Sequence, residues 1–193
     1  MWRARCVMAE AVRSDWKSQL RDILPDFFGP PPGPGGASSA RPLCVPECGE
    51  GWAGVVDRCC VRIAAALQFG ESFRFESIRA HQGALRIRWG GRLSAASEAA
   101  VRAAVDLAEA RSICVCERCG GRGRLYRADD VLAARCADHA EGVPAVRPEM
   151  ENIHLTQVTV RGRLRVVVAA RYDYDSDSFV RIDDAARFGR GEA

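Results

Sequence analysis

Four residues in the second half of the chain have the types and the spacing to hold a metal ion. Cys116 and Cys119 are separated by two residues, and Cys136 and His139 repeat that spacing further along the chain. Thiolates and imidazoles are ligands that zinc prefers, and two close pairs can surround one tetrahedral ion. Such a site leaves no open position for water or substrate. The spacing therefore predicts a structural zinc ion rather than a catalytic one.

The residues around the two pairs favour a zinc ribbon. Gly120 and Gly121 follow the first pair, where the backbone must turn back toward the metal, and glycine readily adopts positive φ. Between the pairs, residues 122–127 and 131–135 have the composition of two short strands around a turn at 128–130. This stretch would let the two ligand pairs face each other.

Sequence reasoning leaves three alternatives to this site. Cys114 is a rival first ligand, because Cys114 and Cys116 also form a close pair. We prefer Cys116 with Cys119, because the glycines follow that pair. The cysteines could instead be free thiols beside a surface His139. A redox role for Cys116 and Cys119 would normally need a βαβ context, which the pattern does not show.

The composition indicates a cytoplasmic protein with one medium-sized domain and some appendages. The chain has 193 residues, 48% hydrophobic composition and a net charge of +3, which by itself is too small to imply nucleic-acid binding. No apolar run approaches the about 18 residues of a membrane span, and the N-terminus is too short and polar for a secretory signal. Nine cysteines without an export signal favour a reducing compartment, where metal ligation and buried thiols explain them better than disulfides.

Changes in pattern along the chain divide it into four parts. They are an N-terminal amphipathic helix (1–28), a Pro/Gly-rich linker (29–40), an α+β core with the zinc ribbon at 116–139 (41–145), and a C-terminal β-hairpin with an acidic tail (146–193). The proline and glycine content of the linker excludes helix and strand. We expect the first helix, over about 8–24, to dock on the body or on a partner.

We predict an α+β fold in which two helices pack on a small antiparallel sheet. The expected elements of the core are a helix over 52–68, strands near 73–78 and 85–89, and a helix over 94–113 with Ser94 as its N-cap. Cys59 and Cys60 fall on the apolar face of the first of these helices and are expected in the core. The zinc ribbon and a hairpin that turns at 161–163 extend this unit.

Several motifs follow one another over about residues 41–140. They are Cys48-Gly-Glu-Gly-Trp52, a strand ending in Gly83-Ala-Leu-Arg86, a helix reaching Arg111, Cys116-Glu-x-Cys-Gly before Gly123, and Cys136-x-x-His139. This order resembles a group of small bacterial and phage-borne proteins with the pattern CGxGW, KEKFGxLRFY, CExCGxxG and CxxH. Where that group has KEKFG, this chain has Arg79-Ala-His-Gln-Gly83. The resemblance implies the fold and the metal, and because some relatives lie beside toxin genes or mobile elements, it also implies an immunity or accessory role.

Other residues offer weaker chemistry. Cys44 and Cys48 could contribute to a second metal site, although we expect Cys48 simply to pack at the turn before the helix. The carboxylates of 173–184 alternate as in a calcium loop, but a serine stands where the loop needs glycine, so we expect a solvated acidic loop. His81 is expected in a loop and His154 on an outward face, and neither has an acidic neighbour that would orient it as a catalytic base.

The function that we predict is protein–protein interaction by a non-enzymatic zinc protein, as an immunity or accessory factor. The first helix and the acidic 173–184 loop are the candidate partner surfaces, and the loop would suit a basic partner. The alternative is nucleic-acid binding, and a nuclease or other hydrolase ranks third. The arginines that could contact phosphates are Arg118, Arg122, Arg124, Arg127 and Arg135 around the ribbon, and Arg79, Arg86, Arg88 and Arg92 on the strands.

Overall fold

The computed structural model describes residues 16–29, 43–160 and 164–182, which form a mixed α+β fold with four α-helices and three antiparallel sheets. The helices are α2 (Trp16–Ile23), α3 (Pro25–Phe28), α4 (Ala53–Ala66) and α5 (Ala95–Ile113). The strands are β1 (Ser72–His81), β2 (Ala84–Arg92), β3 (Arg124–Ala128), β4 (Val131–Arg135), β5 (Val143–Pro144), β6 (Ile153–Val160), β7 (Leu164–Asp173) and β8 (Ser178–Arg181). No helix in these ranges is long and apolar enough to cross a membrane.

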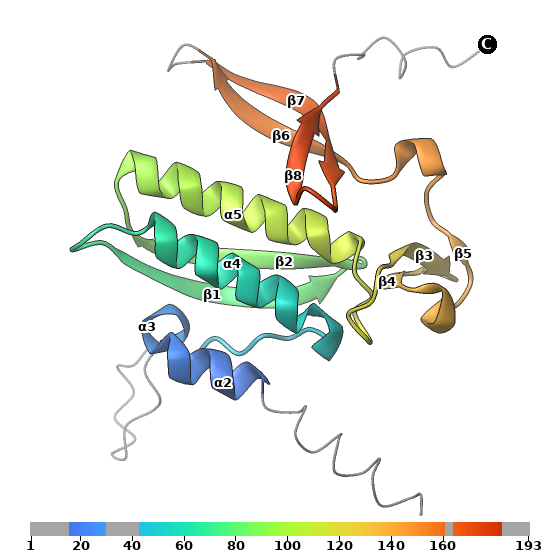
Figure 1. Cartoon of the computed structure of the whole chain (residues 1–193), viewed down its shortest axis with the longest axis horizontal. Helices are drawn as coiled ribbons and strands as arrows, with labels where there is room; N and C mark the ends of the chain where they lie inside the picture. Colours follow the sequence, from blue (N-terminus) through green and yellow to red (C-terminus); the bar gives the residue numbers. More distant parts are fainter. Residues whose placement is uncertain (1–15, 30–42, 161–163, 183–193) are drawn as a thin grey trace, which may run out of the picture.

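The centre of the molecule is the β1–β2 hairpin covered on one face by α4 and α5, which lie side by side (Figure 1). The side chains between these layers include the fully buried Val56, Ile63 and Leu85. Cys59 and Cys60 are completely buried on α4, as the helical periodicity predicts. The predicted α+β class with antiparallel strands is therefore confirmed.

Local signals place the boundaries of this unit. Ser94 is extended and its Oγ accepts a hydrogen bond from Ser97 N at 3.3 Å, so it caps α5 as predicted. The hairpin turns at Gln82 and Gly83, both with positive φ. Gly83 also lies against the third strand, because a Cβ there would be 2.3 Å from Leu125 Cδ1. A β-bulge interrupts the register between Phe75 and Ser77.

The N-terminal segment docks on the body through aromatic side chains. The predicted helix over 8–24 is described only from Trp16, where α2 begins, and most of the predicted linker lies outside the described residues. A second, four-residue helix follows directly, and the sequence pattern did not predict it. It buries Phe27 and Phe28, and the Phe27 ring lies 5.0 Å from that of Phe73.

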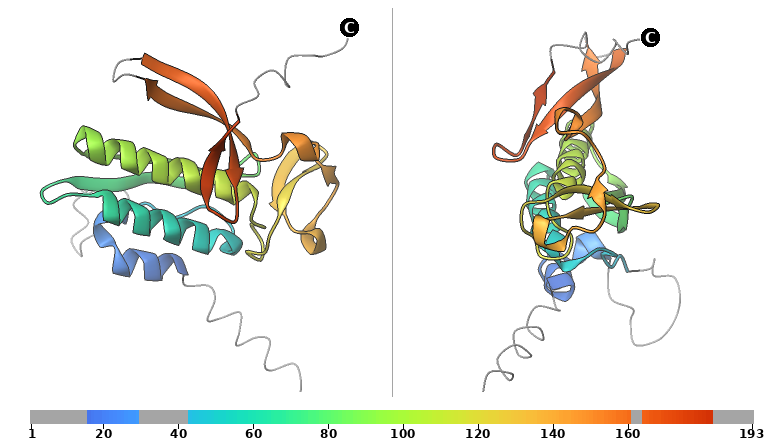
Figure 2. Two further views of the ribbon diagram at one scale, coloured as in Figure 1. Left: turned by 45° about the horizontal axis from the view of Figure 1, so that its top comes forward. Right: turned by 90° about the vertical axis from the view of Figure 1, so that its right-hand side faces the viewer.

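The C-terminal part is a three-stranded sheet in the order β6-β7-β8 that stands on the side of α5 away from α2 and α3 (Figure 2). The predicted hairpin of the first two strands is confirmed. The prediction of a loop over 173–184 is wrong in its middle, because a tight turn leads into β8, which pairs with β7. Tyr172 and Cys114 join a small second core between this sheet and α5.

Candidate metal centre

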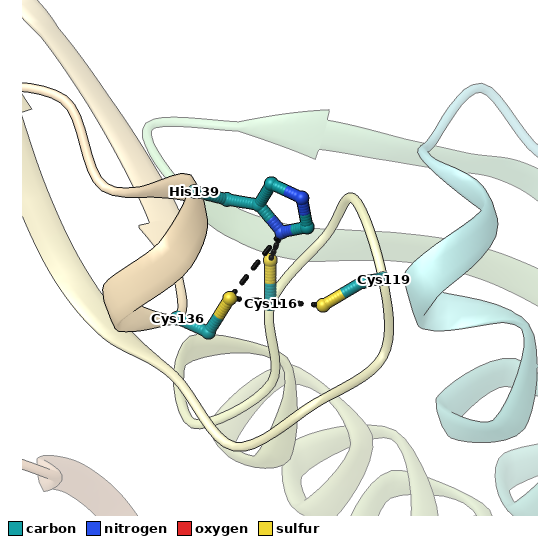
Figure 3. A group of neighbouring side chains, drawn as sticks. All are labelled: Cys116, Cys119, Cys136 and His139. Carbon is teal, nitrogen blue, oxygen red and sulfur yellow. Dashed lines mark hydrogen bonds between the residues drawn. The ribbon is translucent and has the colours of Figure 1, made fainter.

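The four predicted ligands come together at one point between the end of α5 and the β3–β4 hairpin (Figure 3). Their donor atoms all lie within 4.8 Å of one another. Cys119 Sγ is 3.7 Å from Cys136 Sγ, and His139 Nδ1 is 3.6 Å from Cys116 Sγ and 3.3 Å from Cys136 Sγ. Three sulfurs and one imidazole nitrogen facing a common centre could hold a metal ion.

The first pair sits on a tight turn. Gly120 N donates to Cys116 O at 2.8 Å, and Cys116 N donates to Gly121 O at 2.8 Å, so the backbone folds back over the cysteines. Gly120 has φ +78°, which an L side chain rarely adopts, while Gly121 does not have positive φ. The predicted need for glycine is therefore met at Gly120.

The second pair follows the β3–β4 hairpin. The two strands pair from Arg124 opposite Arg135 to Ala128 opposite Val131, close to the predicted bounds. Cys136 comes directly after β4, and His139 ends the short 3-10 helix Ala137–His139. This single turn places both side chains on the side of the first pair.

The electrostatics of the cluster favour a cation. Burial opposes ionisation of Cys116, but the backbone N–H groups of Cys136, Cys119 and Arg118 and the His139 ring lower its pKa to about 6. The Gly121 N–H favours the Cys119 thiolate, yet its pKa is raised, because the neighbouring sulfurs of Cys116 and Cys136 oppose a second negative charge. A bound cation would remove this repulsion.

The turn before α4 packs directly on the first pair. Gly51 N donates to Glu117 O at 2.8 Å, Gly49 N donates to Glu117 Oε1 at 3.1 Å, and the buried Trp52 Nε1 donates to Val115 O at 2.9 Å. A Cβ at Gly51 would be 2.2 Å from Cys116 O. Sequence reasoning missed the role of Glu117. Gly49 and Gly51, two residues apart, were the signal in the sequence for a close backbone approach at this turn.

Most arginines around the cluster are engaged within the chain. Arg135 pairs with Glu117 at 3.3 Å, Arg122 pairs with Asp175 at 3.1 Å, and Arg124 pairs with Glu151. Arg118 and Arg127 are exposed, and neither forms an ion pair within the described ranges. Three of the five predicted arginines around the ribbon are therefore paired with carboxylates.

The other cysteines of the described ranges lie outside the four-residue cluster. Cys114 Sγ contacts Asn152 Oδ1 at 3.1 Å and not the four-residue cluster. Cys44 is buried and Cys48 is half-buried at the turn before α4. In the part of the chain that the structure describes, no second group of metal-ligating side chains is present. The interpretation of Cys48 as a packing residue agrees with this arrangement.

The two other histidines have different surroundings. His81 is exposed at the end of β1 rather than in a loop. The expectation that His154 faces outward is wrong, because its ring packs 5.6 Å from Phe179 and 6.5 Å from Tyr172, and its buried Nε2 has no hydrogen-bond partner among the described residues. Burial lowers the pKa of His154.

The acidic turn is not a free surface. Asp177 pairs with Arg62 at 2.7 Å and with Arg111 at 3.4 Å, and it accepts a hydrogen bond from Tyr172 Oη at 2.5 Å. Asp173 Oδ1 accepts hydrogen bonds from two backbone N–H groups of the same turn. The expectation of a solvated acidic loop is therefore wrong for Asp177, which ties the C-terminal sheet to α4 and α5.

A groove of about 350 Å³ lies on the β3–β4–β5 sheet. We call it the ribbon groove, and its lining includes Arg118, Tyr126, Val131, Ala133, His139 and Glu141. Tyr126 alternates with Leu125, whose side chain meets the β1–β2 turn, so the groove is on the sheet face turned away from the core.

Comparison with known proteins identifies no relative. No protein-family model, no curated protein and no solved structure matches the chain. The functional conclusions therefore depend on the geometry of the chain itself.

Proposed function

We propose that Cys116, Cys119, Cys136 and His139 bind one structural zinc ion as a zinc ribbon, and that the protein acts by binding a protein partner. The observation that carries this proposal is the closed set of four protein donor atoms within 4.8 Å. With four protein ligands, zinc has no position for water or substrate. A binding role in the cytoplasm follows better from such a site than an enzymatic one.

The spacing of the donor atoms supports zinc in particular. Zn–S bonds of about 2.3 Å and Zn–N bonds of about 2.05 Å, arranged tetrahedrally, require S···S distances of about 3.8 Å and S···N distances of about 3.6 Å. The Cys119–Cys136 sulfurs are 3.7 Å apart, and the S···N distances to His139 are 3.6 and 3.3 Å. These three of the six separations match a tetrahedral ion, and the others lie within 4.8 Å.

The position of the cluster supports a structural role for the ion. It lies where the turn before α4, the end of α5 and the β3–β4 hairpin meet, and Gly49 in that turn is 68 residues from Glu117. An ion at this junction would hold the hairpin against the helical core. Metal-binding free energy would then appear as folding free energy.

The ribbon groove is the best-supported surface for a protein partner. It combines an aromatic and an aliphatic side chain, Tyr126 and Val131, with charged side chains, the composition of a protein interface core and its rim. Val131 is 66% exposed, so its side chain is available to a partner. A basic partner at 173–184 has less support, because Asp177 is already paired within the chain. The immunity or accessory role stays a proposal that rests on the sequence resemblance.

Metal content and thermal stability test the zinc site. The purified chain should contain one zinc ion, and chelation or Cys119→Ser should cost at least about 5 kcal/mol, or roughly 10–20 °C in Tm for a chain of this size. Cys48→Ser is the matched control, since it removes a half-buried thiol outside the cluster and should retain the metal. A metal-free protein with unchanged Tm would refute the proposal.

Two equally exposed valines test the partner surface. Val131→Asp places a charge in the ribbon groove, and Val61→Asp places the same charge on α4, where the valine is 61% exposed. A partner captured by the wild-type chain should be lost with Val131→Asp and kept with Val61→Asp. Equal capture by both variants would exclude the groove as the partner surface.

A further inference from the structure

The β1–β2 hairpin presents a row of arginines on the face that the helices leave open. Along β2, exposed arginines alternate with the buried Leu85 and Ile87, which face α4 and α5. In Figure 1 the two helices lie in front of the hairpin, so the arginine face is turned away from the viewer. This arginine face consists of Arg74, Arg79, Arg86, Arg88 and Arg92.

Carboxylates neutralise this face only in part. Glu76, at the bulge, is 3.7 Å from both Arg74 and Arg88, and Glu109 pairs with Arg86 at 2.9 Å. Glu47 pairs beside Arg79 at the β1 edge and brings a third carboxylate near these five guanidinium groups. Asp26 and Glu71 lie near the Arg92 end, but Glu71 accepts hydrogen bonds from the backbone N–H groups of residues 68 and 94. Arg79 and Arg92 form no ion pair in the described ranges, and Arg88 shares Glu76 with Arg74.

The register of the hairpin places like charges side by side. Arg79 lies directly opposite Arg86 in the antiparallel ladder. Directly opposed side chains are about 5 Å apart at Cβ, and like charges at such positions destabilise a sheet. Glu109 offsets the charge of Arg86, and an anionic ligand would offset that of Arg79.

The hairpin holds its arginines on a fixed support. Leu85 N donates to Ser112 Oγ at 2.8 Å, and Ile87 N donates to Glu109 Oε1 at 2.9 Å, so α5 satisfies the free edge of β2. The opposite edge, at β1, is covered where Glu47 pairs with residues 78 and 80. Because the β1 edge and the β2 edge of the hairpin are both covered at these residues, a large ligand would bind the hairpin on its flat arginine face.

We propose that this arginine face binds the phosphate backbone of duplex DNA. From Arg86 to Arg92 the strand extends about 20 Å, and the two strands lie about 4.8 Å apart, so the hairpin matches the scale of a major groove about 12 Å wide. Single-stranded nucleic acid is held largely by stacking on aromatic rings, and of the rings in β1 and β2 only the His81 imidazole shares this face. An RNA duplex has a deep and narrow major groove that suits a flat hairpin less well.

This proposal adds a second binding surface to the function proposed above. The arginine face belongs to β1 and β2, while the ribbon groove belongs to the β3–β4–β5 sheet. Val131→Asp should therefore abolish partner capture and leave DNA binding intact, which keeps the two proposals separately testable.

The test measures binding of a 20-bp DNA duplex by fluorescence anisotropy between 50 and 200 mM salt, with the zinc-loaded full chain. Contacts from three to five arginines predict a slope of log K against log salt of about −2.7 to −4.5, or a loss of affinity of about 40- to 500-fold over this range. Arg79→Gln with Arg88→Gln should reduce the steepness by about 1.8. The matched control is Arg58→Gln with Arg102→Gln, which removes the same charge from exposed positions of α4 and α5 and should preserve the slope more closely.

Each result decides the proposal. Loss of slope in the arginine-face variant alone supports it, whereas absence of duplex binding at 50 mM salt, or equal losses in both variants, overturns it. Tighter binding of the corresponding single strand or of an RNA duplex overturns the assignment to duplex DNA. All four substituted arginines are exposed, so the variants should keep Tm within about 2 °C. If the double variant melts lower, Arg88→Gln alone should reduce the steepness by about 0.9.

Discussion

Adding one methyl group at Gly51 should disrupt the contact between the turn before α4 and the first ligand pair. A Cβ there would lie 2.2 Å from Cys116 O, 2.5 Å from Gly120 N and 2.7 Å from Glu117 C, all of them backbone atoms. Since real Cβ atoms essentially never come closer than 3.0 Å, the backbone of the ligand turn must move away. Gly51 does not have positive φ, so the steric contact alone determines the cost.

The expected cost lies at the upper end of the range for overpacking. Inserting a methylene into a packed site costs about 1–3 kcal/mol, and the atoms here are backbone atoms that cannot rotate away. We expect Gly51→Ala to cost about 3 kcal/mol, or roughly 6–12 °C in Tm for a chain of this size. It should also weaken zinc binding, because the displaced turn carries Cys116 and Cys119.

Gly54→Ala is the matched control, three residues further along the chain. A Cβ at Gly54 meets nothing within 4 Å, and the residue lies in the first turn of α4. Alanine favours a helix over glycine by about 1 kcal/mol, so this variant should melt about 2–4 °C above wild type. Thermal unfolding followed by circular dichroism, with zinc competition by a chromophoric chelator, compares the two. Equal stability of both variants would refute the packing of Gly51 on the ligand turn.

Two further predictions concern ionisable groups outside the cluster. Burial disfavours the charged form of Asp177, but hydrogen bonds from Tyr172 and Arg62 hold its pKa below the usual value. The contribution of Asp177 to the free energy of unfolding should therefore be fully present above the unfolded pKa of about 3.9. It should be lost as the pH falls through the folded pKa. Wild-type Tm should fall more steeply than that of Asp177→Asn on acidification below about pH 4, and parallel profiles would contradict this. Burial raises the pKa of Cys60 to about 12, so iodoacetamide at pH 7.5 should label this thiol only after the protein unfolds. Peptide mass spectrometry measures the labelling. Labelling of the native protein would show that the face of α4 that carries Cys60 is open to solvent.

Features set by neighbouring residues could be predicted from the sequence. The start of α5 depends on Ser94, whose side chain caps the N–H three residues later, and both partners are visible in the sequence. The turn of the β3–β4 hairpin and the two ligand pairs likewise depend on short spacings. The four ligands could be chosen because each pair already brings two donors together within one turn.

Features that depend on contacts between distant residues needed the tertiary structure. Glu117 is a charged residue between two cysteines, and only the folded chain places its carboxylate on Gly49 N, 68 residues away. Phe27 lies on a four-residue helix, too short for any helical periodicity, and its place is decided by the ring of Phe73.

The acidic turn illustrates the same division. Its alternating carboxylates indicate a solvated loop, because a charged side chain is rarely buried without a partner. Asp177 has such partners in Arg62 and Arg111, which α4 and α5 supply from far away in the sequence. The spacing of residues along the chain determined the ligand set and the main elements, since those interactions span a few residues. The tertiary structure alone decided which charges are paired and which, such as Arg79 on the arginine face, form no ion pair within the described ranges, because pairing requires residues that only folding brings together.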